Sequence, residues 1–429
     1  MSVTEQRTVL PLCRRMVQLF KGKFARASAW MLVGTIVVGL LGYVFQVLMG
    51  RMLSTEEYGL FIAMMALFNW FATPLNTLMM VISRKISEYL SRQDSGSITH
   101  FYYSINKRTA IVGTLILGVY LFLATQIQFY LKAPSIIPVY LLGLLLFFTF
   151  LPIINNGFLQ GLQRFIWLSA TSSLTILLKI IFSAVLVWLG YGIAGALGGT
   201  ILAIIAGFLI TYGALYRTLA EGRGLPFQTE HLSIKPALPV MAANVAFATM
   251  TQLDIVLVNY YFPAHEAGLY AAASVLGKAV MYLPGGIVMA LFPMVAENHA
   301  RSQSSLHLLL QAVGLTIFLS GAGAVFYFMF GEGIIALLYG EDYRSAGDVL
   351  KFYGFAILPM ALVMVAEYFL IAKGRVLFAY LFVLFAPLQL IAVHFFHDSL
   401  QMVVAVMGVS GLMLAILGYG LLWNMSKRT

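Results

Sequence analysis

Two oppositely charged residues, Asp254 and Lys278, lie in consecutive apolar stretches of the sequence, at about residues 239–261 and 268–295. If both stretches cross a membrane, each charge costs about 2.5–3.5 kcal/mol to insert and faces a protein interior or a watery cavity. With a rise of about 1.5 Å per residue, the two lie at depths of about 10 and 15 Å, within reach of an ion pair. The spacing therefore predicts one polar site, which either binds a substrate or proton or holds two helices together.

A third charge, Lys179, lies about thirteen residues inside another apolar stretch, and no acidic residue is near it in the sequence. A cation without a local partner suits an anionic ligand such as a pyrophosphate group. Alternatively, the amine reaches the membrane surface or pairs with a distant carboxylate. The interpretation as a ligand-binding group makes Lys179 the third candidate for the site.

Uncharged polar residues recur at helical spacing in several of the apolar stretches. A polar face on a membrane helix must look into the protein or into a water-filled cavity. Amide hydrogen bonds between packed helices are the alternative explanation. The further candidates for a shared cavity, besides the three charges, are Asn69, Asn76, Asn244, Gln252 and Glu367. The histidines have no metal-ligand spacing, so we expect no metal and no other cofactor beyond coupling to H⁺ or Na⁺.

Composition places these residues in a membrane protein. Of the 429 residues, 61% are hydrophobic and 10% are charged, whereas a soluble domain carries about a quarter charged residues. Apolar runs of about 20 residues recur along the whole sequence, and each is long enough to cross a hydrocarbon core of about 30 Å. We therefore predict an all-α membrane protein with about twelve spans, at 28–50, 58–82, 109–130, 136–159, 166–188, 192–216, 239–261, 268–295, 307–330, 347–371, 377–396 and 401–424.

Lysine and arginine residues are concentrated in alternate loops. With the N-terminus inside, the inner segments hold 20 of them and the outer loops hold only 3, at Arg51, Lys132 and Arg344. This bias predicts that both termini are cytoplasmic. Residues 1–26 alternate basic and apolar side chains at helical spacing, which indicates an amphipathic helix on the lipid surface, with a solvated tail as the alternative. Because the net charge of +10 lies in these segments, it favours membrane lipids rather than nucleic acid as partners.

Short matches at a fixed spacing divide the sequence into similar halves. Residues 57–61 match residues 266–270 at an offset of 209, and 158–159 match 369–370 at an offset of 211. Six spans per half give both copies one orientation, with a substrate site between two lobes near mid-membrane and a pseudo-two-fold axis along the membrane normal. The predicted parts are a cytoplasmic segment 1–26, a six-helix lobe 27–217, a cytoplasmic loop 218–235 and a six-helix lobe 236–429.

Five motifs resemble those of polysaccharide-exporting flippases, at residues 51–59, 160–165, 266–270, 291–293 and 338–343. Over nearly its whole length the chain resembles the oligosaccharide flippase (Wzx-type, polysaccharide transporter) family. That family lies within the multidrug/oligosaccharidyl-lipid/polysaccharide exporter superfamily. The resemblance implies a bacterial inner-membrane protein that moves a lipid-linked, undecaprenyl-pyrophosphate-type oligosaccharide for O-antigen or exopolysaccharide synthesis, by alternating access of two lobes. Lipid II flippases of that superfamily usually have fourteen spans, so twelve argue against that branch.

Other functions stay open beside the flippase. A cation-coupled multidrug or toxin extruder of the same fold would use Asp254, but lysines in the cavity disfavour cationic drugs. A polysaccharide polymerase, which is a membrane enzyme, tends to carry a large outer loop, whereas the longest here is about sixteen residues, at 331–346. A scaffold without transport would not need intramembrane charges. We expect no enzymatic activity, a monomer as the transport unit, and contact with polymerase or export machinery.

Overall fold

Helices form almost all of the described part of the chain. The computed structural model describes residues 23–228, 233, 235–286, 291, 295, 306–372 and 377–426, and these include no strand. The first half forms α2 (Lys23–Met52), α3 (Thr55–Ser91), α4 (Ser95–Phe122), α5 (Ala124–Leu131), α6 (Ile137–Gly161), α7 (Phe165–Leu186) and α8 (Gly192–Glu221). The second half forms α9 (Leu238–Tyr261), α10 (Ala264–Tyr282), α12 (Leu306–Tyr339), α13 (Ala346–Ala372), α14 (Leu377–Phe395) and α15 (Leu400–Ser426).

The predicted all-α membrane fold is confirmed by these helices. Within the described ranges, nine helical segments are long and apolar enough to cross a membrane, with α7 and α8 counted as one segment. α10 ends at Tyr282, two residues before Pro284. Most of the predicted amphipathic segment 1–26 lies outside the described residues, as do parts of the predicted loop 218–235 and of the span 268–295.

α3 and α4 extend well beyond the spans predicted for them. The charged stretch between residues 83 and 108, expected as a loop, is helical except for a turn at 92–94. Glu88 bonds to Lys85 at 3.1 Å and to Arg92 at 2.5 Å, at spacings that stabilise a helix. Asp94 then caps α4 by accepting a hydrogen bond from the backbone N–H of Ser97 at 2.9 Å. These local bonds explain why the polar sequence continues the helices.

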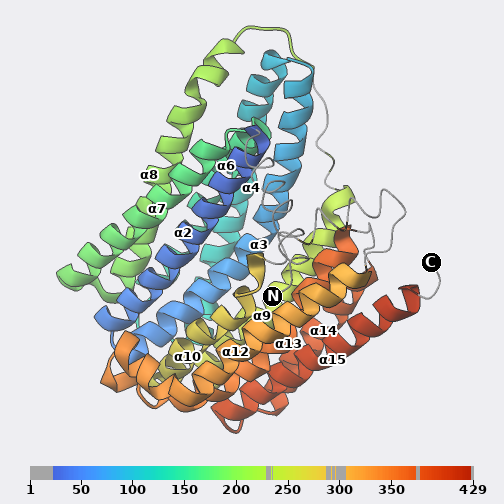
Figure 1. Cartoon of the computed structure of the whole chain (residues 1–429). Coiled ribbons are helices and arrows are strands. Elements are labelled where there is room, and N and C mark those ends of the chain that lie inside the picture. Colours follow the sequence, from blue (N-terminus) through green and yellow to red (C-terminus); the bar gives the residue numbers. More distant parts are fainter. Residues whose placement is uncertain are drawn as a thin grey trace, which may run out of the picture.

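The two halves form two lobes that meet at one end of the molecule, which we call the closed end (Figure 1). The α2–α3 turn and the α9–α10 turn lie there. Tyr58 OH on α3 lies 3.2 Å from Tyr339 OH on α12. Arg51 also reaches across the lobes, because its guanidinium donates to the carbonyls of Leu337 and Leu338. These bonds tie the first lobe to the end of α12.

A second set of bonds ties α9 to the first lobe at the closed end. Asn259 donates through Nδ2 to the carbonyl of Leu131 at 2.6 Å. Lys132 Nζ lies 3.4 Å from the carbonyl of Phe262. The rings of Tyr130 and Tyr260 stack with centroids 4.5 Å apart. The closed end is therefore held by polar and aromatic contacts on both sides of the interface.

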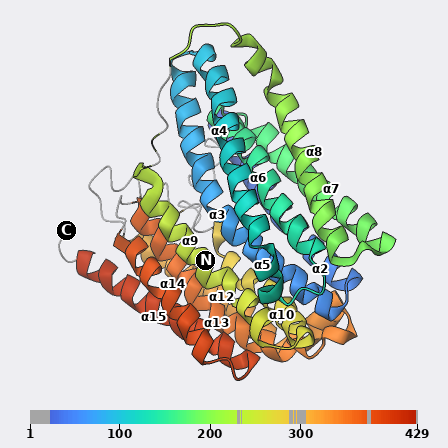
Figure 2. The ribbon, with the colours of Figure 1, turned by 180° about the vertical axis from the view of Figure 1, so that it is seen from behind.

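Toward the opposite end, which we call the open end, the lobes separate (Figures 1 and 2). One buried apolar cluster contains residues of both lobes, and its first-lobe members lie in the parts of the helices toward the closed end. A second cluster lies wholly in the first lobe near the open end, and it includes Ile82, Tyr89 and Phe158. Among the described residues, the shared apolar core therefore holds the lobes together mainly at the closed end.

Helix boundaries follow the internal repeat. α2 ends at Met52 and α9 at Tyr261, while α3 begins at Thr55 and α10 at Ala264. Both pairs of boundaries have the offset of 209 found in the sequence. Because the two equivalent turns lie at the same end of the molecule, the copies have the same orientation.

Two pairs of residues that are 209 positions apart contact each other directly. Glu56 Oε1 lies 3.3 Å from His265 Nδ1. Gly59 and Gly268 are so close that a Cβ on Gly59 would lie 2.7 Å from the backbone nitrogen of Gly268. A residue that touches its own repeat mate must lie near the axis that relates the copies. The crossing of α3 and α10 therefore marks the pseudo-two-fold axis.

The cation bias predicts how this fold is oriented in the cell. Cysteines placed near Asp94 and Arg223 at the open end should react with an impermeant maleimide only from the cytoplasm. Cysteines near His265 and Asp342, at the closed end, should react from outside. The measurement is labelling of intact cells against inverted vesicles, with Cys13 first replaced by serine. External labelling at Asp94 would reverse the assigned orientation.

Candidate functional site

A cavity of about 890 Å³ lies between the lobes. Its walls come from α2, α3 and α7 of the first lobe and from α9, α10 and α13 of the second. The charged residues that line it are Lys179 and Lys278, and no aspartate or glutamate is among the described lining residues. A low-dielectric cavity lined by cations alone attracts anions.

Lys278 connects this cavity with a buried carboxylate. Its Nζ lies 3.4 Å from Oδ1 of Asp254, and the side-chain exposures are 8% for the lysine and 0% for the aspartate. Lys278 lines the cavity, whereas Asp254 lies behind it. The ion pair between consecutive spans that the sequence predicted is therefore present, on α10 and α9.

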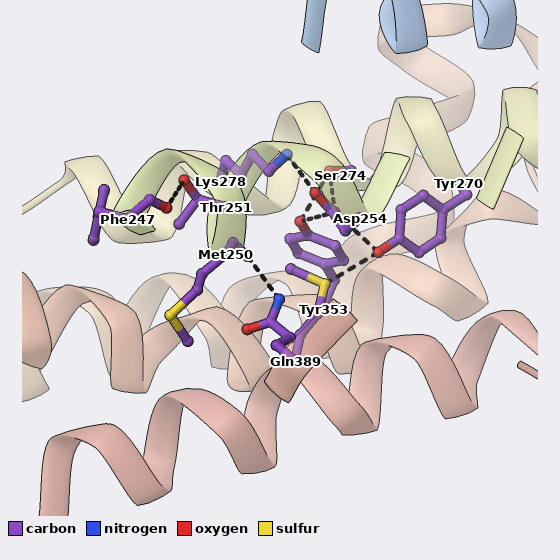
Figure 3. A network of polar contacts seen from close by, with 10 residues as sticks. Phe247, Met250, Thr251, Asp254, Tyr270, Ser274, Lys278, Tyr353 and Gln389 are labelled. Atoms are coloured by element: carbon purple, nitrogen blue, oxygen red, sulfur yellow. Dashed lines mark hydrogen bonds and ion pairs between the residues drawn. The ribbon is translucent and has the colours of Figure 1, made fainter. Parts of the chain in front are cut away.

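Three hydroxyl groups complete the surroundings of Asp254 (Figure 3). Tyr270 and Tyr353 each donate to Oδ2 at 3.0 Å, and Ser274 donates to the same oxygen at 3.4 Å. Ser274 Oγ and Tyr353 OH lie 2.9 Å apart, and the hydroxyl of Tyr270 also contacts Met407 Sδ at 3.2 Å. The network ties α9, α10, α13 and α15 together within the second lobe.

Lys179 enters the cavity from α7 in the first lobe. Its Nζ lies 3.9 Å from the centroid of the Phe45 ring on α2, a distance typical of a cation–π contact. Among the described residues, no carboxylate pairs with it. Phe45 stands 209 positions before Asp254. The two cavity lysines therefore rest against the same position of the repeat, one on a ring and the other on a carboxylate.

The predicted polar candidates divide into two groups. Asn69 and Gln252 line the cavity together with the lysines. Asn76, Asn244 and Glu367 are not among its lining residues, so a transport role for them stays a prediction. Asn76 is exposed on α3, Asn244 is half-buried on α9, and Glu367 is buried on α13. In the described ranges, no three histidine, cysteine, aspartate or glutamate residues gather as metal ligands.

The hydroxyl groups around Asp254 were missed in the sequence. Tyr270, Ser274 and Lys278 are spaced four residues apart, so they share one face of α10. This four-residue spacing could have identified the two hydroxyls from the sequence, because side chains on the helix face that carries Lys278 can reach the same carboxylate. Tyr353 gave no such signal, since it lies 99 positions from Asp254 and reaches it only through the packing of α13.

Four glycines line the cavity, two from each lobe. Gly39 and Gly42 belong to α2, and Gly285 and Gly286 follow α10. A Cβ on any of the four would meet no atom within 4 Å. Gly277, one helix position from Lys278, differs because a Cβ there would lie 2.3 Å from the Tyr353 ring. Close packing therefore does not require glycine at these four positions.

Comparison with known proteins gives a family for this chain. A family model described as polysaccharide biosynthesis protein matches residues 24–299, which reach from α2 past the end of α10. Among curated proteins, no sequence matched significantly. The family match includes both cavity lysines and Asp254.

Solved structures give the fold independently. An inward-facing multidrug resistance MATE family transporter of the MOP superfamily matches with a TM-score of 0.80 and 14% identity, over 91% of this chain and 94% of that chain. The lipid II flippase MurJ, in an inward closed conformation, matches with a TM-score of 0.70 and 15% identity, over 93% and 87%. An outward-facing MATE transporter of the same superfamily gives a TM-score of 0.63, with 16% identity over 96% and 97%. Identities this low show a shared fold only.

Proposed function

Because the chain belongs to the polysaccharide biosynthesis protein family, we propose that it is a flippase for a lipid-linked oligosaccharide. The substrate class is an oligosaccharide on an undecaprenyl-pyrophosphate-type carrier, moved from the inner to the outer leaflet of the bacterial cytoplasmic membrane. The product would serve polysaccharide synthesis such as O-antigen or exopolysaccharide. The transport unit would be a monomer beside the polymerase and export machinery.

The observation that carries this proposal is the charge of the cavity. Two lysines line it from opposite lobes, and no carboxylate is among its described lining residues. A pyrophosphate carries negative charge on several oxygens, so it can accept charge-assisted hydrogen bonds from both amines. Because the two amines belong to different lobes, a pyrophosphate bound to both would also connect the lobes. The open glycine walls leave room for a sugar beside the pyrophosphate.

The mechanism would be alternating access. The lobes are joined at the closed end by the contacts of Arg51, Tyr58 and Asn259 and are separated at the open end. In transport, the closed end would part while the open end closes, so that the cavity faces the other leaflet. The apolar tail of the carrier would stay in lipid throughout, because moving it through a polar cavity would expose it to water.

The same proposal includes an energy source, which is the movement of a coupling cation. Transport would be coupled to H⁺ or Na⁺, and Asp254 is the carboxylate in contact with a cavity lysine. A buried carboxylate needs a positive partner, so it can respond to the entry of a small cation. No other cofactor would be required.

The second candidate function is export of cationic drugs. A cation-coupled extruder of the same fold would use the buried carboxylate of Asp254 for coupling, but two lining lysines would repel a cationic ligand. The charge of the cavity therefore ranks the anionic lipid carrier above the drug.

Reconstitution distinguishes the two functions. In proteoliposomes, the purified protein should move a fluorescent undecaprenyl-pyrophosphate-linked sugar out of reach of an impermeant quencher, and empty liposomes should not. Cationic dyes such as ethidium should not be transported. Dye transport without movement of the lipid-linked sugar would replace the flippase by the extruder.

A further inference from the structure

Lys278 links the polar network of the second lobe to the cavity. Four side chains bond to Asp254, and only Lys278 also lines the cavity. Tyr270, Ser274 and Tyr353 are buried and lie away from the lining. Among these four side chains, Lys278 is therefore the one through which a ligand in the cavity can affect the buried carboxylate.

The bonds to Asp254 are unequal in a way that suits such competition. Oδ1 has Lys278 as its partner at 3.4 Å, longer than the roughly 2.7–2.9 Å of a strong ammonium–carboxylate bond. Oδ2 lies within hydrogen-bond distance of three hydroxyls, at 3.0, 3.0 and 3.4 Å. If the lysine leaves, the carboxylate keeps hydroxyl donors from this group, which reduces the cost of a buried charge without its counterion.

Among the described side chains in contact with Asp254, Lys278 is the one cation. The groups that face Asp254 are Tyr270, Ser274 and Lys278 from α10, Tyr353 from α13 and Met407 from α15, through the tyrosine it contacts. Among these described groups, the lysine alone is positively charged. Its amine is therefore shared between the carboxylate and an anion that binds beside it in the cavity.

We propose that Lys278 is an exchangeable counterion. It bonds to Asp254 when the cavity is empty, and it turns to the anionic group of the substrate when the cavity is loaded. This inference rests on the proposed function, because it needs an anion in the cavity. Asp254 then acts as a positioning residue, which lowers the affinity for the anion and returns the lysine after release.

The consequence is a negative coupling between Asp254 and the substrate. Coupling free energies between interacting sites typically change affinity about 5- to 150-fold. Removing the charge of Asp254 frees the lysine permanently, so anion affinity should rise at least about fivefold. A pair that only holds two helices together predicts the opposite, because its loss would disturb the cavity wall.

The test measures binding of undecaprenyl pyrophosphate to the full-length protein in nanodiscs. Asp254→Asn keeps the shape of the side chain and should bind the probe at least about fivefold more tightly. Lys278→Ala should bind more weakly, and the double variant should match Lys278→Ala. Glu332→Gln is the control, since it removes one of the two carboxylate partners of Lys351, at 2.5 Å, in an ion pair outside the cavity lining. It should bind as the unchanged protein does.

Unchanged or weaker binding by a folded Asp254→Asn protein overturns the exchange. If that variant does not fold, a structure of the unchanged protein with the probe decides instead. Lys278 Nζ on a phosphate oxygen and more than about 4 Å from Asp254 supports the proposal, because that is beyond ion-pair distance. A lysine that remains on the carboxylate refutes it.

Failure of the exchange is distinct from failure of the proposed function. If Lys179→Ala and Lys278→Ala both bind the probe normally, the anionic substrate itself is wrong. If both weaken binding while Asp254→Asn does not strengthen it, the substrate stands and only the exchange is lost.

Discussion

Alanine in place of Lys179 or Lys278 is expected to stop glycan export while the protein remains in the membrane. Each amine lies in the cavity between the lobes, where a hydrogen bond from a charged donor contributes about 1.5–3 kcal/mol. Loss of one amine should therefore reduce affinity for a pyrophosphate about ten- to hundredfold. The measurement is surface glycan in a strain that lacks the chromosomal copy, with protein amount checked by immunoblot.

Matched variants separate charge from stability in this experiment. Lys179→Ala is the cleaner change, because the amine contacts a ring and leaves no buried carboxylate behind. Arginine at either position keeps the charge and should restore part of the export. Lys351→Ala is the control, since this lysine pairs with Glu332 and Asp348 outside the cavity lining. Normal export by both cavity alanine variants would contradict the cationic-cavity mechanism.

A side chain at Gly268 is expected to prevent the lobes from closing. A Cβ there would lie 2.0 Å from the carbonyl oxygen of Thr55, which is a backbone atom and cannot turn away. Overpacking typically costs about 1–3 kcal/mol, and a clash with backbone at a helix crossing should reach or exceed the upper value. Gly268→Val should therefore lower the melting temperature strongly and abolish export.

The control for this prediction is a glycine of the same kind in open surroundings. A Cβ on Gly118 of α4 would meet no atom within 4 Å. Gly118→Val should therefore leave both melting temperature and export close to those of the unchanged protein. Equal melting temperatures for the two variants would mean that the close approach at Gly268 does not hold the lobes together.

Much of the fold could be predicted because it depends on local properties of the chain. The length of each apolar run determines whether it can cross the bilayer, and the offset of 209 is visible without any packing. The pairing of Asp254 with Lys278 also followed from local spacing, since the two residues lie at similar depths on consecutive helices joined by a short turn. The helical extension of α3 and α4 was missed because polar composition was taken to indicate a loop.

The rest of the site depends on contacts between distant parts of the chain. Tyr353 meets Asp254, and Lys179 meets Phe45, only because α13 and α7 pack in a particular register. Side-chain types do not specify that register. The cavity lining shows the same limit, since Asn69 and Asn76 are two helical turns apart on α3 and only Asn69 lines it.

The contact of Gly59 with Gly268 also bears on how such a chain could have arisen. Residues that touch their own repeat mates are arranged as they would be in a homodimer of one six-helix ancestor. In a homodimer, a substitution appears on both sides of the axis at once. After gene fusion each side can mutate alone, so one copy can keep Phe45 while the other has Asp254. A fused chain can therefore place one cavity lysine against a ring and the other against a carboxylate, whereas a symmetric homodimer cannot.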